Sequence, residues 1–272
     1  MPASSPTQSS PTKAELQALV TFACSLADIA AEVTLQYFRQ LQNVDNKMED
    51  GKFDPVTIAD REAEAKMRTS IEKHYPTHGV LGEEHGAKAG SEDLTWVLDP
   101  IDGTRAFISG IPVWGTLIAL FDGEQPILGV VDQPFTDERF VASGNQSKYF
   151  HKNSESVLST RDCKTLDNAV MMSTAPDMFN SDEYQRQQQL AKQVKLMRYG
   201  ADCYAYCMLA GGHIDLVVEA DLKPFDIQAL IPIVKNAGGV VTDWQGGSAV
   251  NGGQVIAAAT PALHAQALKL LT

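Results

Sequence analysis

A short apolar segment that ends in two aspartates constrains this chain more than any other feature. The apolar residues 96–98 predict a strand, and Asp99 follows them directly. Pro100 fixes its own φ angle, so the chain turns at once and places Asp102 in the same tight loop. Two carboxylates in one loop repel each other unless a cation lies between them, and ligation by oxygen alone suits Mg²⁺. An ordinary Asp/Gly turn has the same residues, so the motif by itself leaves both interpretations open.

Other acidic residues have a similar double interpretation. Glu83 follows a short apolar run, where a glutamate is either an exposed surface residue or a metal ligand that also orients water. Asp226 begins an apolar segment as a helix N-cap does, but a capping carboxylate also points away from the core, as a ligand must. Asp54 and Asp60 lie on either side of a short extended segment. We interpret Asp60 as the cap of the next helix, whereas Asp54 has no such structural role.

The first half of the chain predicts helices followed by a sheet. Apolar residues at helical spacing predict a first helix over residues 13–41 and a second over residues 60–74. Short apolar runs separated by turn residues then predict a mostly antiparallel sheet. These runs are residues 79–81, 95–98, 113–121, 127–131 and 139–142.

Helices and strands alternate in the second half. The predicted strands are residues 169–173, 194–199, 214–218, 240–242 and 254–258, and the predicted helices are residues 182–192, 202–210, 226–237 and 261–271. Pro232 lies inside the third of these helices, where we expect a kink. The pattern predicts an α/β layered sandwich in two halves, residues 13–150 and 151–272, after a disordered tail over residues 1–12.

Charge and composition disfavour several classes of partner. The 34 acidic residues outnumber the 22 basic ones, and the net charge of -12 repels nucleic-acid phosphates and anionic lipid. No apolar run approaches the roughly 20 residues of a membrane span, and residues 1–12 lack the apolar core of a signal peptide. The four cysteines have no disulfide-type spacing. We therefore expect a cytoplasmic protein without a nucleic-acid or membrane partner.

Three of these segments together resemble the inositol monophosphatase family of Mg²⁺-dependent, lithium-sensitive phosphatases. They are Gly82-Glu83-Glu84, the Asp-Pro-Ile-Asp-Gly-Thr string at residues 99–104, and Asp226 before an apolar helix that ends in Ala237-Gly238-Gly239. They occur in the order and approximate spacing of the family, and the likeness extends from Leu16 to the C-terminus. The resemblance implies an α-β-α-β-α sandwich with metal ions between its halves, a small phosphorylated substrate and a homodimer.

The resemblance also implies a set of metal ligands. Glu83, Asp99 and the main-chain carbonyl of Ile101 would bind a first Mg²⁺. Asp99, Asp102 and Asp226 would bind a second, and Glu83 would reach a weaker third ion through water. The family thus implies two or three Mg²⁺ ions.

The remaining catalytic roles come from the same resemblance. The N–H groups of Gly103 and Thr104 would bind the phosphate. Asp54 and Thr104 would help to deprotonate the attacking water, Glu83 would take part in catalysis, and no covalent intermediate would form.

Residues 198–204 and 218–226 look most like the histidinol-phosphatase branch of the family. Members that act on inositol usually have a small residue at the place of Asp202. The acidic pair Asp202 and Glu219, with Asp102 and Arg198 beside them, would suit the ammonium and imidazole groups of L-histidinol phosphate. Inositol would leave the charge of Asp202 unpaired, which is costly in a dry pocket. Alternatively, Asp202 is a solvent-facing N-cap, and Arg105 is either a substrate contact or a surface residue.

The leading hypothesis is therefore a phosphatase of L-histidinol phosphate in histidine biosynthesis. The alternative with the same fold is an inositol-1-phosphatase, or a broader sugar or nucleotide phosphatase such as one that removes the 3'-phosphate of adenosine bisphosphate. The alternative from another class is an inactive scaffold or regulatory protein. A scaffold has no reason to gather repelling carboxylates, which favours the enzyme.

Overall fold

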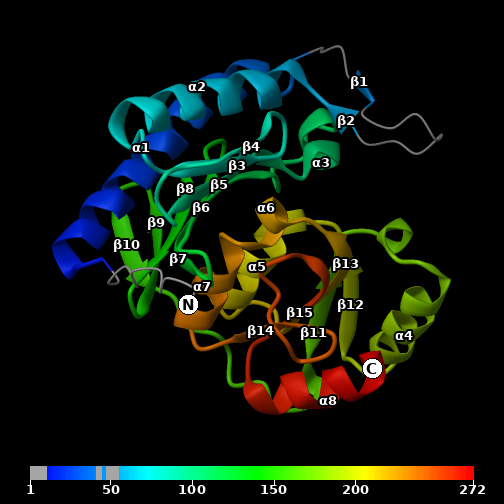
Figure 1. Ribbon diagram of the computed structural model, residues 1–272. Coiled ribbons are helices and arrows are strands. Elements are labelled where there is room, and N and C mark those ends of the chain that lie inside the picture. Colours follow the sequence, from blue (N-terminus) through cyan, green and yellow to red (C-terminus); the bar gives the residue numbers. More distant parts are fainter. Residues whose placement is uncertain (1–10, 41–44, 47–54) are drawn as a thin grey trace, which may run out of the picture.

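Five layers of helices and sheets make up the molecule (Figure 1). The computed structural model describes residues 11–40, 45–46 and 55–272. The first helical layer holds α1 (Lys13–Tyr37) and α2 (Ile58–His74), and the middle one holds α5 (Asp202–Ala210), α6 (Pro224–Ile227) and α7 (Leu230–Asn236). The last holds α4 (Ser181–Ala191) and α8 (Pro261–Leu271). A sheet lies between each two helical layers, so the predicted α-β-α-β-α sandwich is confirmed.

The first sheet has eight strands and is mostly antiparallel, as the turn-separated runs predict. In spatial order they are β10 (Ser154–Val157), β9 (Gln146–His151), β8 (Glu138–Ser143), β7 (Pro126–Gln133), β6 (Gly115–Phe121), β5 (Thr95–Asp102), β3 (Gly79–Gly82) and β4 (Gly86–Lys88). Only β3 and β5 pair in parallel among these strands. The sequence pattern missed β4, β9 and β10, because β4 and β10 are wholly exposed and β9 is mostly half-buried, so none of them has an apolar run. The chain leaves the first sheet only after β10.

Both helices of the outer layer differ from the prediction at one end. α1 ends at Tyr37 instead of residue 41, because Phe38 turns inward to pack against Phe107 and Trp114. α2 begins at Ile58, and its N-cap is Thr57 instead of Asp60. Asp60 occupies the third helical position, where its carboxylate accepts hydrogen bonds from the N–H and hydroxyl of Thr57.

The first helix also corrects the expectation about apolar segments. By length and composition, α1 is apolar enough to cross a membrane. Its apolar side is instead part of the core beneath it, with residues such as Leu26, Ala27 and Ala30 completely buried. Core helices of this kind pass the same test, so this finding is weak evidence for a membrane span. The predicted tail falls outside the described residues except for its last two, and Thr12 there already caps α1.

The second sheet has five strands in the order β12 (Leu196–Tyr199), β11 (Val170–Ser173), β13 (Leu216–Leu222), β15 (Gly253–Ala258) and β14 (Val240–Asp243). Shorter elements complete the described chain: a two-stranded ladder of β1 (Asp45–Asn46) and β2 (Pro55–Val56), helix α3 (Thr104–Ile108), and the 3₁₀ turns η1 (Leu166–Asn168) and η2 (Pro176–Met178).

The helix predicted over residues 226–237 is two helices. α6 ends at Ile227 and α7 begins at Leu230, so the break precedes Pro232 instead of kinking the helix at it. Pro232 lies in the first turn of α7, where a main-chain N–H has no partner within the helix and its absence costs little.

Strand β5 connects the core to the functional region. Trp96 and Leu98 belong to the core beneath α1 and α2, whereas Val97 belongs to the core around α5 and α7. Helices thus cover both faces of this strand, which explains its continuous apolar run. The first polar side chain after the run, Asp99, comes where the pairing of β5 with β6 shifts register, and α6 packs against this strand.

Candidate metal centre and active site

The loop at the end of β5 is held by its own hydrogen bonds. The N–H of Ile101 donates to Asp99 Oδ1 at 3.0 Å, and the hydroxyl of Thr104 donates to the carbonyl of Ile101 at 3.1 Å. From β6, the hydroxyl of Thr116 donates to the carbonyl of Pro100 at 2.8 Å. These bonds give the loop one conformation, which fixes the direction of its aspartates.

Three carboxylates meet at this loop. One oxygen each from Asp99, Asp102 and Asp226 lies within 4.8 Å of the other two. Asp99 and Asp102 come from β5, while Asp226 comes from α6, more than a hundred positions later in the chain. The fold therefore brings together the acidic residues of two separate motifs.

Main-chain N–H groups orient all three carboxylates. Asp102 accepts the N–H of Cys203 from α5 at 2.7 Å, and Asp226 accepts the N–H of Lys223 at 2.7 Å. Lys223 is the N-cap of α6 and Asp226 its third residue, so the N-cap interpretation of Asp226 is wrong by three positions. In each carboxylate one oxygen accepts a main-chain N–H, which fixes the orientation of the group.

The cluster carries unfavourable electrostatic energy. Burial, together with the charges of Glu83 and Asp102, raises the pKa of Asp99 well above its usual value. Burial and the charges of Asp202 and Asp226 do the same to the pKa of Asp102. Burial raises the pKa of Asp226 to about 8, although the hydrogen bond from the N–H of Lys223 lowers that pKa. Ionised carboxylates in such a place require positive charge close by.

Glu83 joins the cluster from the turn after β3. Its charge raises the pKa of both Asp99 and Asp226, and at Asp99 only burial has a larger effect. The side chain of Glu83 therefore faces these two carboxylates. The N–H of Glu83 donates to the carbonyl of Leu98 on β5 at 3.2 Å.

The sequence reasoning missed Glu64, which holds this turn in place. Its completely buried carboxylate on α2 accepts the N–H groups of Glu84 at 2.7 Å and His85 at 3.1 Å. Arg68, one turn along α2, donates to the same carboxylate at 2.6 Å. A glutamate on the apolar face of α2, in register with Met67 and Ile71, was the signal available in the sequence.

Asp60 is a second residue that the sequence reasoning undervalued. Its Oδ2 caps α2, but its Oδ1 is buried and has no hydrogen-bond partner among the residues that the structure describes. Burial raises its pKa to about 7, and the charges of Glu84 and Glu83 raise it further while Thr57 lowers it. Asp60 is therefore a buried carboxylate near Glu83, with one oxygen uncommitted. Asp54, to which the sequence assigned a role in deprotonating water, lies outside the described residues.

Asp202 approaches the loop from the second half. Gly103 has a φ of +82°, and a Cβ there would lie 3.1 Å from the carboxylate carbon of Asp202. Ala201 is the N-cap of α5, and Asp202 is the first helical residue and half-buried, so the solvent-facing N-cap interpretation is wrong. Burial raises the pKa of Asp202 to about 6, and the charge of Arg105 lowers it.

Glu219 lies deeper in the second half. Its carboxylate, 2% exposed, accepts the N–H and hydroxyl of Thr174 and the hydroxyl of Tyr206. Burial raises the pKa of Glu219 to about 7, with Asp202 contributing in the same direction and Thr174 and Tyr206 in the other. The charge of Asp202 reaches Glu219, whose own oxygens are already bonded.

The donor set fits divalent cations that bind oxygen. It consists of crowded, partly or fully buried carboxylates oriented by backbone N–H groups. The Ile101 carbonyl, predicted as a further ligand, accepts the hydroxyl of Thr104 but has a second lone pair for a metal.

Comparison with known proteins decides the family. The model of the inositol monophosphatase family matches residues 15–272. This chain belongs to the inositol monophosphatase family. Family members are metal-dependent phosphatases of small phosphorylated substrates, so the chain is a phosphoric monoester hydrolase by family.

Relatives in the family differ in their stated substrates. The chain is 42% identical to the bifunctional phosphatase IMPL2, chloroplastic, of Arabidopsis thaliana. The matched 269 residues cover 94% of this chain and 76% of that protein. It is 32% identical over 242 residues to a histidinol-phosphatase of Chlorobaculum parvum, and the match covers 89% of this chain and 92% of that protein. The structure of an inositol monophosphatase from Zymomonas mobilis matches this one with a TM-score of 0.83 and 38% sequence identity. The match covers 94% of this chain and 98% of that chain. The family is therefore settled, and the substrate within it is open.

Two arginines near the family site have different positions. Arg105, next to Thr104, forms an exposed ion pair with Asp177 of η2 at 3.0 Å, which connects the two halves beside the cluster. Arg198 is exposed on β12, at the edge of the second sheet and four residues before Asp202. His85 is exposed and hydrogen-bonds through Nε2 to the carbonyl of Arg61, as expected of a residue that is not a ligand.

Proposed function

We propose that the protein hydrolyses L-histidinol phosphate to L-histidinol and phosphate with Mg²⁺, as a step of histidine biosynthesis. The observation that carries this proposal is the position of Asp202. Its carboxylate lies against Gly103, in the turn whose N–H groups would receive the phosphate. A substrate bound there by its phosphate extends past a half-buried negative charge, which favours a substrate with a cationic group.

The metal ligands of this proposal are the clustered carboxylates. Glu83 and Asp99, with the carbonyl of Ile101, would hold one Mg²⁺, and Asp99, Asp102 and Asp226 would hold another, with Glu83 also near a third. The bound cations supply the positive charge that activates water as a nucleophile and stabilises the leaving oxygen. The protein residues bind, orient and move protons around them.

Phosphate binding falls to the turn after Asp102. Gly103 is the N-cap of the short helix α3, and Thr104 is its first residue. The main-chain N–H groups at this end of a helix have no partner within the helix. The positive φ of Gly103 turns the backbone at this point. These donors would hold the phosphate oxygens and align phosphorus for in-line attack.

We propose Asp60 as a group that takes the proton of the attacking water, while Thr104 keeps its predicted role beside Asp54 in the same step. Oδ1 of Asp60 is buried, unpartnered and close to Glu83. Its main-chain bond through Oδ2 keeps it oriented. Asp54 stays a prediction for the same role, so Asp60→Asn and Asp54→Asn are compared. The proposal expects kcat to fall by a factor of about a hundred or more for Asp60→Asn, and a larger loss in Asp54→Asn would reverse the assignment.

The substrate side of the proposal rests on charge. Asp202, supported by the charge of Glu219 behind it, would attract the ammonium or imidazolium of histidinol phosphate. Arg198 and Asp102 remain predicted substrate contacts. The histidinol-phosphatase relative from Chlorobaculum parvum supports this substrate, at 32% identity.

The test offers L-histidinol phosphate and inositol 1-phosphate side by side to the purified protein with Mg²⁺. We expect a preference of at least a hundredfold in kcat/KM for histidinol phosphate, about 2.7 kcal/mol of transition-state discrimination. Asp202→Ala should remove most of this preference while retaining hydrolysis of inositol phosphate. Equal or reversed rates in the wild type would overturn the substrate and leave the phosphatase intact.

Inositol-1-phosphatase activity is the second candidate. The Zymomonas mobilis structure supports it, since that inositol monophosphatase shares 38% identity with this chain. Failure to hydrolyse either substrate, with Mg²⁺ bound, would favour another sugar or nucleotide phosphate or an inactive scaffold.

We also propose a homodimer, inhibition by lithium and a cytoplasmic location, which light scattering, inhibition assays and fractionation would test. The chloroplastic relative makes fractionation necessary.

A further inference from the structure

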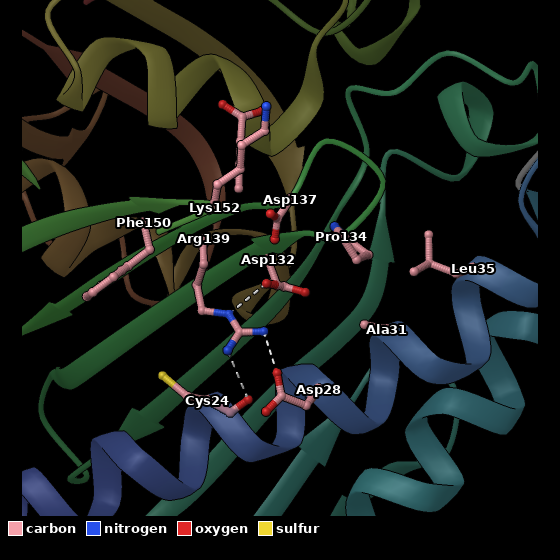
Figure 2. A pocket seen from close by; sticks show the side chains of 11 residues that line it. Cys24, Asp28, Ala31, Leu35, Asp132, Pro134, Asp137, Arg139, Phe150 and Lys152 are labelled. Carbon is pink, nitrogen blue, oxygen red and sulfur yellow. Dashed lines mark hydrogen bonds and ion pairs between the residues drawn. The ribbon is translucent and has the colours of Figure 1, made fainter. Parts of the chain in front are cut away.

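A cavity lies on the opposite face of the first sheet from α5 (Figure 2). It has a volume of about 530 Å³, within the range of small-molecule sites. Residues of α1 form one wall, and the ends of β7, β8 and β9 form its floor. None of its lining residues belongs to the metal cluster described above.

The floor of this cavity holds charges at positions where the sheet is otherwise apolar. Leu128 and Val130 on β7 belong to the core beneath α1, and the period of two places Asp132 on the same face. Arg139 on β8 pairs directly with Asp132 and lies on this face too. Burial of a charged pair in an apolar row costs free energy unless its hydrogen bonds are complete.

The hydrogen bonds of this pair are incomplete. Arg139 Nε donates to Asp132 Oδ1 at 2.7 Å, and a second nitrogen donates to Asp28 of α1 at 2.7 Å, as Figure 2 shows. Within the described part of the chain, Asp132 Oδ2 is buried without a hydrogen-bond partner, in a side chain that is 5% exposed. Figure 2 shows this oxygen on the side of the carboxylate away from Arg139, toward the part of the cavity beside Ala31. An unsatisfied buried acceptor of this kind favours a donor.

The lining of the cavity also selects the charge of a ligand. The carboxylates of Asp28, Asp132 and Asp137 line it, against two cationic side chains, of which Arg139 already bridges Asp28 and Asp132. Glu138 contributes no charge to the cavity, because its carboxylate is bonded to Tyr204 of α5 on the other face of the sheet. Apolar groups, including Ala31 and Phe150, complete the wall. Burial raises the pKa of Asp132, while Arg139 lowers it, so one guanidinium does not fully compensate the buried charge.

We propose that this cavity binds a small organic cation, a primary ammonium attached to a compact apolar group, with the ammonium beside the carboxylate of Asp132. The ammonium supplies the positive charge and donors that the floor lacks, and the apolar group contacts the wall of α1. This site is independent of the phosphatase site and does not rest on the proposed substrate.

Benzylammonium is the probe, and calorimetric titration of the full chain with saturating Mg²⁺ is the measurement. The Mg²⁺ occupies the phosphatase carboxylates and keeps them from binding the probe. We expect saturable binding of benzylammonium, with benzyl alcohol at least tenfold weaker. Equal binding of the alcohol, or no binding of the amine up to about 20 mM, would overturn the proposal. In the second case the bridge from Asp28 to Asp132 only fastens α1 to the sheet.

Three variants locate the binding. Asp132→Asn should weaken benzylammonium at least tenfold. Ala31→Trp, at a half-buried position of α1, fills the cavity without breaking the ion bridge and should abolish binding. Glu32→Gln, the matched control, removes a carboxylate from the exposed side of the same helix and should leave binding within twofold. Binding that survives in Ala31→Trp would place the probe elsewhere and overturn the site. A circular-dichroism melt checks that each variant is folded.

Discussion

At the scale of single residues, the site depends on backbone groups that hold carboxylates in an unfavourable arrangement. Asp102 and Asp226 each give one oxygen to a main-chain N–H, from Cys203 and Lys223. Among the described residues, no lysine or arginine forms a salt bridge with either, since the nearby Arg105 and Lys223 pair with Asp177 and Asp221. The chain thus keeps the negative charge of the cluster available to cations and stabilises it mainly through main-chain dipoles, with a smaller contribution from the charge of Lys223 at Asp226.

Gly103 is the residue where backbone conformation and side-chain contact coincide. Gly103→Ala should destabilise the fold by more than Gly123→Ala, because both glycines have positive φ but only Gly103 faces a neighbour, Asp202. The conformation alone costs about 1–2 kcal/mol for a residue with a Cβ. Denaturant melts of both variants measure the difference, and Gly103→Ala should also lower kcat/KM at least tenfold. Adding Asp202→Ala should recover the contact part of the stability loss. Equal losses at Gly103 and Gly123 would contradict this account.

At the scale of elements, α2 positions the turn after β3 through a buried carboxylate. Glu64→Gln should raise the Mg²⁺ concentration for half-maximal activity about tenfold, because the bonds to the N–H groups of Glu84 and His85 weaken and Glu83 loses its orientation. Initial rates against Mg²⁺ concentration are the measurement. Glu72→Gln on the same helix removes an exposed ion pair with Lys88 and should leave the Mg²⁺ dependence unchanged. An unchanged dependence in Glu64→Gln would mean that the turn holds its shape without α2.

The outer helix α8 makes stability depend on pH. Burial lowers the pKa of His264, whose Nε2 lies 2.8 Å from the hydroxyl of Thr242. The unfolded chain therefore binds a proton more readily, so stability is fully present above about pH 6.5 and falls as the pH is lowered further. His264→Gln should flatten this fall between about pH 7 and 5, measured by denaturant melts. Burial also lowers the pKa of His78, although the charge of Glu92 raises it. Part of the dependence of stability on pH should therefore remain in His264→Gln. Exposed His74→Gln is the control, and a curve parallel to wild type in His264→Gln would refute the assignment.

At the scale of the whole molecule, cation binding should stabilise the fold, because the ligands come from both halves of the chain. At a Mg²⁺ concentration of 100 Kd the gain is about 2.7 kcal/mol. For a chain of this size that raises Tm by roughly 5–10 °C, measured by calorimetry with Mg²⁺ against EDTA. Asp226→Asn should lose most of the shift, yet be no less stable than wild type in EDTA, since it removes one of the repelling charges. The exposed, remote Asp162→Asn is the control, and an undiminished shift in Asp226→Asn would contradict the proposed ligand.

Much of the fold could be predicted because it depends on local periodicity. The apolar spacing of α1 and the buried run of β5 have the same meaning in any context, since burial is what produces them. Elements without an apolar pattern, such as β9 and β10, could not be found in this way. The end of α1 could not either, because it depends on Phe38 meeting Phe107 and Trp114 from a distant segment.

The sequence by itself determined the chemistry of the protein: a loop with two aspartates, a glutamate before it and an aspartate far beyond, in the order of the inositol monophosphatase family. Order along the chain is enough for that, because residue types and short-range spacing decide which ligands are available. The tertiary structure alone decided which acidic residues share a site. It brought Asp202 against Gly103, buried Oδ1 of Asp60 near Glu83, and placed Glu64 beneath the turn. Burial and distance between remote segments set the energy of a charge, and both arise only when the layers pack.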